Sequence, residues 1–224
     1  INLKNEKTIF SDESTIETAY QYAYEKGNQK LIDANMVGIP LDTEVKKDGK
    51  TISKAETKYD NPVNLLPSSV LSYNMQSNTP STEVTYDIYD GKRNLIQYTT
   101  KAGVSTSIIW GYNQTQPIAK IEGAKLSDIT QTLINSIVNA SDDTNANYSE
   151  STLLNQLDAF RIALPNFQIS TYTYKPLIGV TTITPPSGIR EYYFYDTANR
   201  LESVKTNENG VLTTLKEYQY HYKP

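Results

Sequence analysis

The sequence predicts a mainly β protein, an antiparallel meander of hairpins interrupted by an inserted α-helical hairpin. In several short segments tyrosines recur at every second position, which is the side-chain period of a strand. Turn pairs that contain glycine separate these segments at short intervals, as expected for consecutive hairpins. Between residues 125 and 164, in contrast, apolar residues recur at helical spacing.

Composition excludes several classes of protein. The 224 residues carry a net charge of −4, which disfavours a generic nucleic-acid binder. No stretch approaches the roughly 20 apolar residues that a membrane-spanning helix needs. The sequence has no cysteine, so disulfides and thiolate metal sites are excluded. The chain starts at Ile1 without a leader pattern and stops within a strand-like pattern, so we expect a section of a longer protein.

Residues 1–81 are predicted to form a degenerate β-hairpin and an irregular N-terminal part. The segment "AYQYAY" places three tyrosines on one face of a strand: Tyr20, Tyr22 and Tyr24. The pair Asp48-Gly49 predicts a tight hairpin turn. Further on, "LIDANMVGIPL" predicts a short helical turn, and "DNPVNLLPSS", with its two prolines, predicts an irregular connection.

Residues 82–122 are predicted to form repeat strands, and residues 123–166 a helical hairpin insert. In the strands, turns are expected at Asp90-Gly91 and at Ala102-Gly103. The first helix is expected over residues 125–138, with Ser127 or a neighbour as its cap. The second helix has four apolar residues at helical spacing, Ser149 as its cap and Pro165 as its stop: Leu153, Leu157, Phe160 and Leu164.

Residues 167–224 are predicted to return to repeat strands. Two segments again alternate tyrosine with a polar residue: "TYTY" (Tyr172, Tyr174) and "EYQYHY" (Tyr218, Tyr220, Tyr222). The pair Asn209-Gly210 predicts a hairpin between them. Such alternation indicates half-buried strands with an aromatic face and a polar face.

Two stretches of the chain repeat one pattern. They are "TYDIYDGKRNLIQYTTKAGVSTSIIWGY" (85–112) and "YYFYDTANRLESVKTNENGVLTTLKEYQYHY" (192–222). Each runs through aromatic residues to an aspartate, a short turn, Arg or Asn, Leu, a polar strand, glycine and a second strand with a closing tyrosine. An internal repeat of this kind indicates an array of similar units.

On these motifs the chain resembles the RHS/YD-repeat (tyrosine-aspartate repeat) family, as found in RHS-type proteins of Bacteroidetes. The resemblance extends from about residue 82 to the end and is weaker before it. The segment "YFYDTANRLESVKTNENG" carries the pattern most closely. The motif residues on which the resemblance rests are Tyr86, Tyr89, Asp90, Gly103, Trp110, Tyr193, Tyr195, Asp196, Arg200, Leu201, Gly210 and Tyr220.

The resemblance implies a curved, shell-like sheet and a structural role. A family shell encloses or presents a C-terminal toxin or a partner, and an exported or cell-surface location follows from the same resemblance. Its tyrosines pack on neighbouring strands, and the aspartate accepts backbone N–H groups in the turn. Two positions depart from the pattern: Asn199 replaces a glycine, and Lys175 replaces an aspartate that would cap its turn.

The sequence contains no clear catalytic or metal-binding motif. We therefore expect no cofactor, no metal site and no enzymatic activity of this chain alone. His221 is the single histidine, which excludes a multi-histidine metal site. A glycosidase pair would need two carboxylates, yet the candidates sit in turns or loops: Asp87, Asp90, Asp142, Asp143 and Asp196. The oxygen-rich segment 140–150 lacks the mid-loop glycine of an EF-hand.

The alternative function is a binding module for carbohydrate or protein at the bacterial cell surface. Trp110, in "IIWGYNQTQ", is the best candidate for a sugar platform, although a packed tryptophan at a strand end has the same sequence signature. Whether the tyrosine faces are covered or open distinguishes the scaffold from the binding module. Open sheet edges are expected at either end of a shell section, with charge and proline as the means of blunting them.

Overall fold

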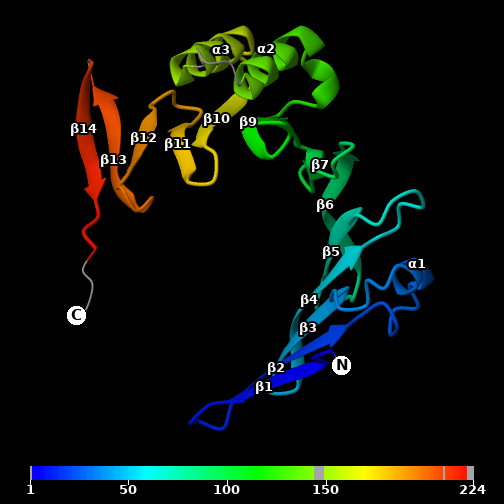
Figure 1. Cartoon of the computed structure of the whole chain (residues 1–224). Helices are drawn as coiled ribbons and strands as arrows, with labels where there is room; N and C mark the ends of the chain where they lie inside the picture. The colour runs from blue at the N-terminus through cyan, green and yellow to red at the C-terminus, as the bar shows by residue number, and fades with distance from the viewer. Residues whose placement is uncertain (1, 144–148, 209, 221–224) are drawn as a thin grey trace. The chain divides into compact units, whose positions relative to one another are not determined.

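The fold is an antiparallel meander that carries two packed helices. The computed structural model describes residues 2–143, 149–208 and 210–220. In these residues 14 strands form one sheet in which each strand pairs with the next along the chain. The predicted fold class is confirmed (Figure 1). The strands are β1 Asn5–Ile9, β2 Thr15–Gln21, β3 Asp42–Lys47, β4 Lys50–Lys58, β5 Ser69–Tyr73, β6 Pro80–Tyr89, β7 Leu95–Thr100, β8 Ser105–Gly111, β9 Gln116–Glu122, β10 Gln168–Lys175, β11 Gly179–Thr184, β12 Glu191–Tyr195, β13 Leu201–Glu208 and β14 Val211–Glu217.

The chain divides into two compact units, and each is described by itself. The first unit holds residues 1–88 and 98–103, and the second holds residues 89–97 and 104–224. The four-part division predicted above remains a prediction. No helix in the described residues has the length and hydropathy required to cross a membrane.

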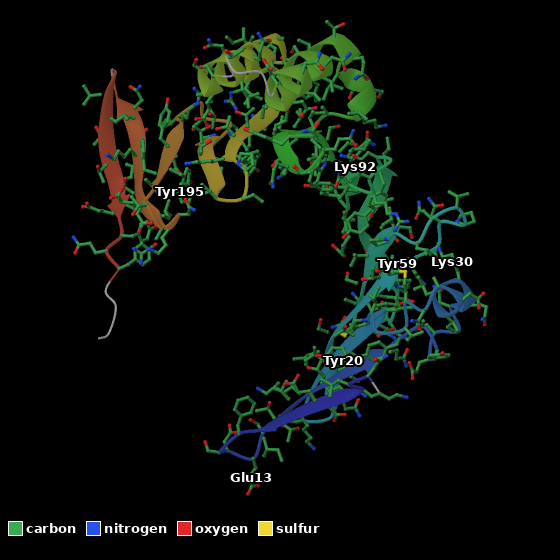
Figure 2. The ribbon with its side chains drawn as sticks, viewed as in Figure 1. Glu13, Tyr20, Lys30, Tyr59, Lys92 and Tyr195 are labelled. Atoms are coloured by element: carbon green, nitrogen blue, oxygen red, sulfur yellow. The ribbon has the colours of Figure 1, made fainter. Side chains whose placement is uncertain are left out.

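A small core in the first unit forms where helix α1 (Gln29–Asp33) packs beside the strands. Leu31, Leu41 and Tyr59 are buried together there. The Lys30 ammonium group donates to three backbone carbonyls, those of Tyr59 (2.6 Å), Asn61 (2.6 Å) and Asn64 (3.0 Å). This lysine therefore fixes the irregular connection that follows β4; Lys30 and Tyr59 are labelled in Figure 2.

The prediction that Tyr20, Tyr22 and Tyr24 share one strand face is wrong. Strand β2 ends at Gln21, and residues 22–28 fold into a tight turn instead. The Asn28 amide donates to the Ala23 carbonyl (2.9 Å), and the Glu25 carboxylate accepts the Tyr22 amide (3.0 Å). These local bonds satisfy the backbone that the strand would otherwise have used, so Tyr22 is buried while Tyr24 is exposed.

The larger core lies in the second unit, between the helices and strands β8 to β10. Helix α2 (Gln131–Asp142) and helix α3 (Glu150–Ala163) pack against each other and against these strands (Figure 1). Their inward residues meet the apolar residues of the strands in one cluster that includes Ile118, Ile121, Ile137, Leu153, Leu157, Phe160 and Ile169. The helical periodicity of the sequence thus marks the face that is buried.

The first helix begins later than the sequence predicted. Residues Leu126–Asp128 form a separate 3-10 turn, in which the Asp128 carboxylate accepts the Lys125 amide (2.8 Å). Ile129 and Thr130 are then extended, so Thr130 and not Ser127 precedes α2. The second helix has the predicted limits: the Ser149 side chain accepts the Ser151 amide (3.2 Å), and Pro165 follows the last turn.

In β10 the buried face is the threonine face and not the tyrosine face. Ile169, Thr171 and Thr173 are almost fully buried, whereas Tyr172 and Tyr174 on the other face are half-buried. The reason is the helical insert, which covers the threonine face. Thr173 donates to the Glu150 carboxylate at the start of α3 (2.6 Å) and so has a partner in the core.

The predicted turns differ in their geometry. Asp48 and Gly49, with φ of 49° and 77°, join β3 to β4 directly, which confirms the tight hairpin. At Asp90-Gly91 the prediction of a tight pair is wrong, because the turn runs to Asn94 and the left-handed residue is Arg93 (φ 71°). Gly103 (φ 76°) and Gly210 (φ 87°) are left-handed where glycine was expected, while Asn209 lies outside the described residues.

Candidate functional site

The two aspartates of the repeat motif each organise a turn of the same design. Asp90 follows β6, and its Oδ1 accepts the amides of Lys92 (2.9 Å) and Asn94 (2.8 Å). Its Oδ2 accepts the Asn94 side-chain amide (3.0 Å). The backbone closes the same turn, because the Asp90 amide donates to the Asn94 carbonyl (2.9 Å) and the Arg93 amide donates to the Asp90 carbonyl (3.0 Å).

Asp196 repeats this arrangement in the turn after β12. Its Oδ1 accepts the amides of Ala198 (2.8 Å) and Arg200 (2.9 Å), and its Oδ2 accepts Arg200 Nε (2.8 Å). The Asp196 amide donates to the Arg200 carbonyl, and the Asn199 amide to the Asp196 carbonyl, both at 2.9 Å. The Arg200 amide and side chain, together with the Ala198 amide, lower the pKa of Asp196.

Both turns need one residue with positive φ immediately before the partner of the aspartate. Arg93 supplies it in the first turn (φ 71°) and Asn199 in the second (φ 60°), as predicted for an asparagine in place of glycine. A third turn of related design was missed in the sequence because asparagine takes the place of aspartate. Asn74 Oδ1 accepts the amides of Gln76 (2.9 Å) and Ser77 (3.1 Å).

Replacing Asp90 by alanine is expected to lower the free energy of unfolding by about 1–3 kcal/mol, because three donors lose their acceptor and two of these donors belong to the half-buried Asn94. Asp90→Asn is the matched control: it retains one carbonyl oxygen and should lose less. Urea unfolding followed by Trp110 fluorescence measures the stability of both variants, since the Trp110 indole donates to the Leu95 carbonyl of β7, the strand that follows the Asp90 turn. Equal stability of Asp90→Ala and the wild-type chain would contradict a structural role for the turn aspartate.

Three tyrosine hydroxyls donate to a backbone carbonyl of the preceding strand. Tyr174 of β10 donates to the Pro117 carbonyl of β9 (3.0 Å), and Tyr195 of β12 donates to the Val180 carbonyl of β11 (2.9 Å). Tyr220, after β14, donates to the Leu201 carbonyl of β13 (2.9 Å). Burial raises the pKa of Tyr174 to about 12. Phenylalanine offers the same ring without this bond, which explains the preference for tyrosine.

The structure brings four motif residues together at one end of the second repeat: Asp196, Arg200, Leu201 and Tyr220. The Arg200 guanidinium forms an ion pair with Asp196 (2.7 Å) and lies 4.4 Å from the centre of the Tyr220 ring. These contacts position the end of β13 against the segment after β14. The prediction that Tyr218 and Tyr220 lie within a strand is wrong, because β14 ends at Glu217; Tyr222 lies outside the described residues.

Other motif residues have local roles. Tyr195 lies against Gly179 of β11 so closely that a Cβ there would come within 2.3 Å of its hydroxyl oxygen. Tyr193 donates to the Glu191 carboxylate (2.6 Å), while Tyr86 and Tyr89 are half-buried in β6. Trp110 is half-buried in β8, with its indole N–H on the Leu95 carbonyl (3.0 Å). At Lys175 the Ile178 amide donates to the Lys175 carbonyl (3.0 Å), and among the described residues no side chain caps this turn.

The carboxylates weighed as a catalytic pair are occupied by separate local contacts. Asp87 accepts from Thr99 Oγ1 (2.7 Å), and Asp142 accepts the Asn113 amide (2.7 Å). No group of three or more potential metal-ligating residues occurs among the described residues. Most of the acidic loop 140–150 lies outside the described residues, and so does His221.

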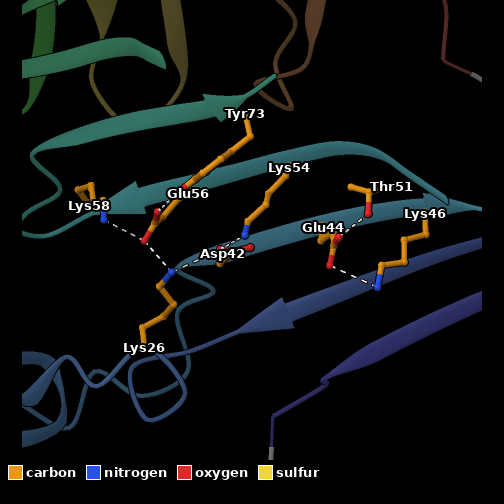
Figure 3. Close-up of polar contacts among 9 residues, drawn as sticks. All are labelled: Lys26, Asp42, Glu44, Lys46, Thr51, Lys54, Glu56, Lys58 and Tyr73. Carbon is orange, nitrogen blue, oxygen red and sulfur yellow. Dashed lines mark hydrogen bonds and ion pairs between the residues drawn. The ribbon is translucent and has the colours of Figure 1, made fainter. Parts of the chain in front are cut away.

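A network of charged residues in the first unit was not predicted. Asp42 of β3 and Glu56 of β4 face each other across the hairpin and are both nearly buried (Figure 3). Lys26 bridges them, at 3.4 Å from Asp42 and 2.8 Å from Glu56, and Tyr73 donates to Glu56 (2.6 Å). Lys54 and Lys58 add a further contact to Asp42 and Glu56 respectively. The only signal in the sequence is the mixture of lysines and acids in these strands.

The chemistry of this network favours a structural role over proton transfer. Burial alone would raise the pKa of Glu56, but hydrogen bonds from Lys26, Tyr73 and Lys58 outweigh it and lower the pKa to about 2. A general acid needs a pKa raised toward the working pH, which is the opposite direction. The same contact raises the pKa of Tyr73 to about 12, mainly because the hydroxyl donates to Glu56.

Comparison with known proteins gives structural similarity only. No family model matches the chain, and no curated protein matches its sequence. Among solved structures, it is similar to a chain of the crystal structure of TcdB2-TccC3-Cdc42, with a TM-score of 0.45 and 13% identity over 92% of this chain and 11% of that chain. The Photorhabdus luminescens Tc holotoxin pore with a mutated TccC3 gives a TM-score of 0.41 and 13% identity, with the same coverage. This chain thus spans about a tenth of the length of those chains.

Proposed function

We propose that this chain is a structural section of a YD-repeat shell, without catalysis of its own. The observation that carries the proposal is the repeated turn at Asp90 and Asp196, which lie more than 100 residues apart. Each aspartate side chain accepts the backbone amides of the residues two and four positions after it. The backbone hydrogen bonds that close the two turns are also equivalent. A chemical site would not need this duplication. A repeated hairpin does, because every unit must present the same strand register to its neighbour.

The exposed edge of β14 supports the proposal that the partner of this chain is a neighbouring repeat. Strand β14 is exposed along its whole length, and within the described residues nothing pairs with its outer edge. Its apolar residues Val211, Leu212 and Leu215 are exposed as well. An unpaired edge of this kind is a template for another strand. In the parent protein that strand belongs to the next repeat, and the completed wall encloses or presents a C-terminal toxin or a protein partner at an exported or cell-surface location.

The reading frame on both sides of this chain tests the proposal. We expect further hairpins with tyrosines before an aspartate turn, and a distinct C-terminal domain after them. A self-contained gene with its own start, signal peptide and stop would overturn the scaffold assignment. The claim of no catalysis is tested separately by a screen of the purified chain against polysaccharides and esters, where any saturable turnover would contradict it.

Size-exclusion chromatography of the isolated chain tests the open edge. If β14 offers an unpaired edge, the chain should associate as its concentration rises. A strictly monomeric species at high concentration would show that charge or proline blunts the edge sufficiently, and would argue against pairing with a neighbour.

A further inference from the structure

The second unit contains a cavity of about 360 Å³ beside the C-terminal end of α2. Two tyrosines, Tyr112 after β8 and Tyr174 of β10, line it together with two carboxylates, those of Asp142 and Asp143. Ligand sites in proteins are concave and have volumes of about 300–1,000 Å³, so this cavity has the size of a site for a small ligand or a single side chain.

Direct contacts join the three elements that surround the cavity. The Tyr112 amide donates to Ser141 Oγ (3.2 Å), and the Asn113 amide donates to Asp142 Oδ1 (2.7 Å). The Tyr112 hydroxyl accepts the Tyr174 amide (2.8 Å). The end of α2, the turn between β8 and β9, and strand β10 therefore meet around one space.

The turn between β8 and β9 is strained. Tyr112, Asn113 and Gln114 are three consecutive left-handed residues, with φ of 52°, 56° and 62°, and none of them is glycine. Each has a steric cost in this conformation, which persists only where surrounding contacts enforce it, and such strain is concentrated at functional sites. Here the contacts from the end of α2 enforce it, and the turn forms part of the cavity wall.

The two tyrosine rings form an ordered apolar wall. Their centres lie 5.6 Å apart, and the ring planes stand at 88° to each other. Each hydroxyl has a backbone partner: that of Tyr112 accepts the Tyr174 amide, and that of Tyr174 donates to the Pro117 carbonyl (3.0 Å). Together with Pro176 the rings offer an apolar surface that loses little conformational entropy when a ligand binds. An aromatic ring also attracts a cation that lies over its face.

The charge beside this wall is negative. Asp142 is the last residue of α2 and Asp143 follows it, at the end of a helix where the dipole favours cations, and the last turn of α2 holds no basic residue. Asp142 Oδ1 accepts only neutral donors, the Asn113 amide and the Ser141 hydroxyl (3.2 Å), and no ion pair within the described residues includes Asp142. Lys92 donates to the Asn113 carbonyl but does not line the cavity. The negative end of α2 therefore favours a cationic ligand.

The apolar wall narrows the class of cation. A metal ion prefers a shell of several oxygen ligands, and no group of three or more potential metal-ligating residues occurs in the part of the chain that the structure describes. An organic cation with an aliphatic stem matches both the tyrosine wall and the carboxylates.

We infer that this cavity binds an alkylammonium group, with its nitrogen at Asp142 and Asp143 and its aliphatic stem against Tyr112, Tyr174 and Pro176. Such a group is carried by a free amine or by the side chain of a lysine in another polypeptide. The inference goes beyond the scaffold role, since a wall section functions as scaffold whether or not an amine occupies this cavity.

Two-dimensional NMR of the 15N-labelled chain tests the inference. The chain is titrated with n-butylammonium and, separately, with the tripeptide glycyl-lysyl-glycine blocked at both ends. The amide signals of Asn113 and Tyr174 should shift saturably, with a millimolar dissociation constant. Tighter binding of the tripeptide identifies a lysine side chain as the ligand, and equal or weaker binding identifies a free amine. The neutral n-butanol and the anionic butyrate should give no saturable shift at the same concentrations.

Two variants identify the carboxylates as the source of affinity. Asp142→Asn and Asp143→Asn should each weaken binding of n-butylammonium at least about threefold, because each removes a negative charge beside the ammonium group. Asp142→Asn keeps a carbonyl oxygen for the Asn113 amide, so the turn should be retained, which the remaining amide signals verify. Glu202→Gln is the matched control: it makes the same change in net charge at an exposed position of the same unit outside the cavity, and should bind like the wild type.

Three results would overturn the inference. The first is the absence of a saturable shift with both n-butylammonium and the lysine tripeptide. The second is equal binding of n-butanol and n-butylammonium, which would make the cavity an apolar site without preference for a cation. The third is binding that neither Asp142→Asn nor Asp143→Asn weakens relative to Glu202→Gln.

Discussion

Phe160→Ala should lower the free energy of unfolding of the second unit by about 3–5 kcal/mol, the usual cost of removing a buried aromatic ring. The Phe160 side chain is 1% exposed and is the largest of the fully buried side chains in the described part of the chain. It packs in the cluster that joins α2 and α3 to strands β8 to β10. If the helices were a loosely attached insert, the sheet would tolerate the change.

The control lies on the same helix. Ile162 is 78% exposed, so Ile162→Ala should change stability by less than about 0.5 kcal/mol. Urea unfolding followed by Trp110 fluorescence reports this unit. A loss below about 1 kcal/mol for Phe160→Ala would mean that the helical hairpin does not contribute to the stability of the strands beneath it.

Glu56→Gln should lower the free energy of unfolding of the first unit by about 3 kcal/mol. The substitution keeps the size of the side chain but removes the negative charge that lies 2.8 Å from Lys26 and 3.0 Å from Lys58. The expected loss is at the lower end of the range for a broken buried pair, because the lysines are partly exposed. Glu6→Gln on the exposed strand β1 makes the same change in net charge and should have almost no effect.

The pH dependence gives an independent check. Because the pKa of Glu56 is lowered from 4.5 to about 2 on folding, the folded chain binds fewer protons than the unfolded chain between these values. The stabilisation is therefore fully present above pH 4.5 and is lost as the pH falls toward 2. Hydrogen exchange of the β3–β4 peptides, measured for wild type and Glu56→Gln, should show a difference that shrinks over this range. If the difference in exchange between wild type and Glu56→Gln stayed constant with pH, the effect of the substitution would not come from the ionisation of Glu56.

Local signals in the sequence predicted those features that depend on neighbouring residues. Asp48-Gly49 forms its hairpin because both residues tolerate positive φ, and Ser149 with Pro165 sets the limits of α3. Asn199 adopts the left-handed conformation expected of it. At Asp90-Gly91 the prediction of a two-residue turn was wrong. The Asp90 side chain accepts amides as far along the chain as Asn94, so the turn is longer.

The tertiary structure decided which faces are buried and which side chains meet. Alternation places Tyr172 and Tyr174 on one face of β10, but only the position of the helices determines that the threonine face becomes the core. Pairing across strands likewise determines that Asp42 faces Glu56. Lys26, in the turn after β2, forms an ion pair with Glu56. Period and turn chemistry act over a few residues and can be read from the chain. Burial and ion pairing depend on residues distant in sequence, whose proximity exists only in the folded chain.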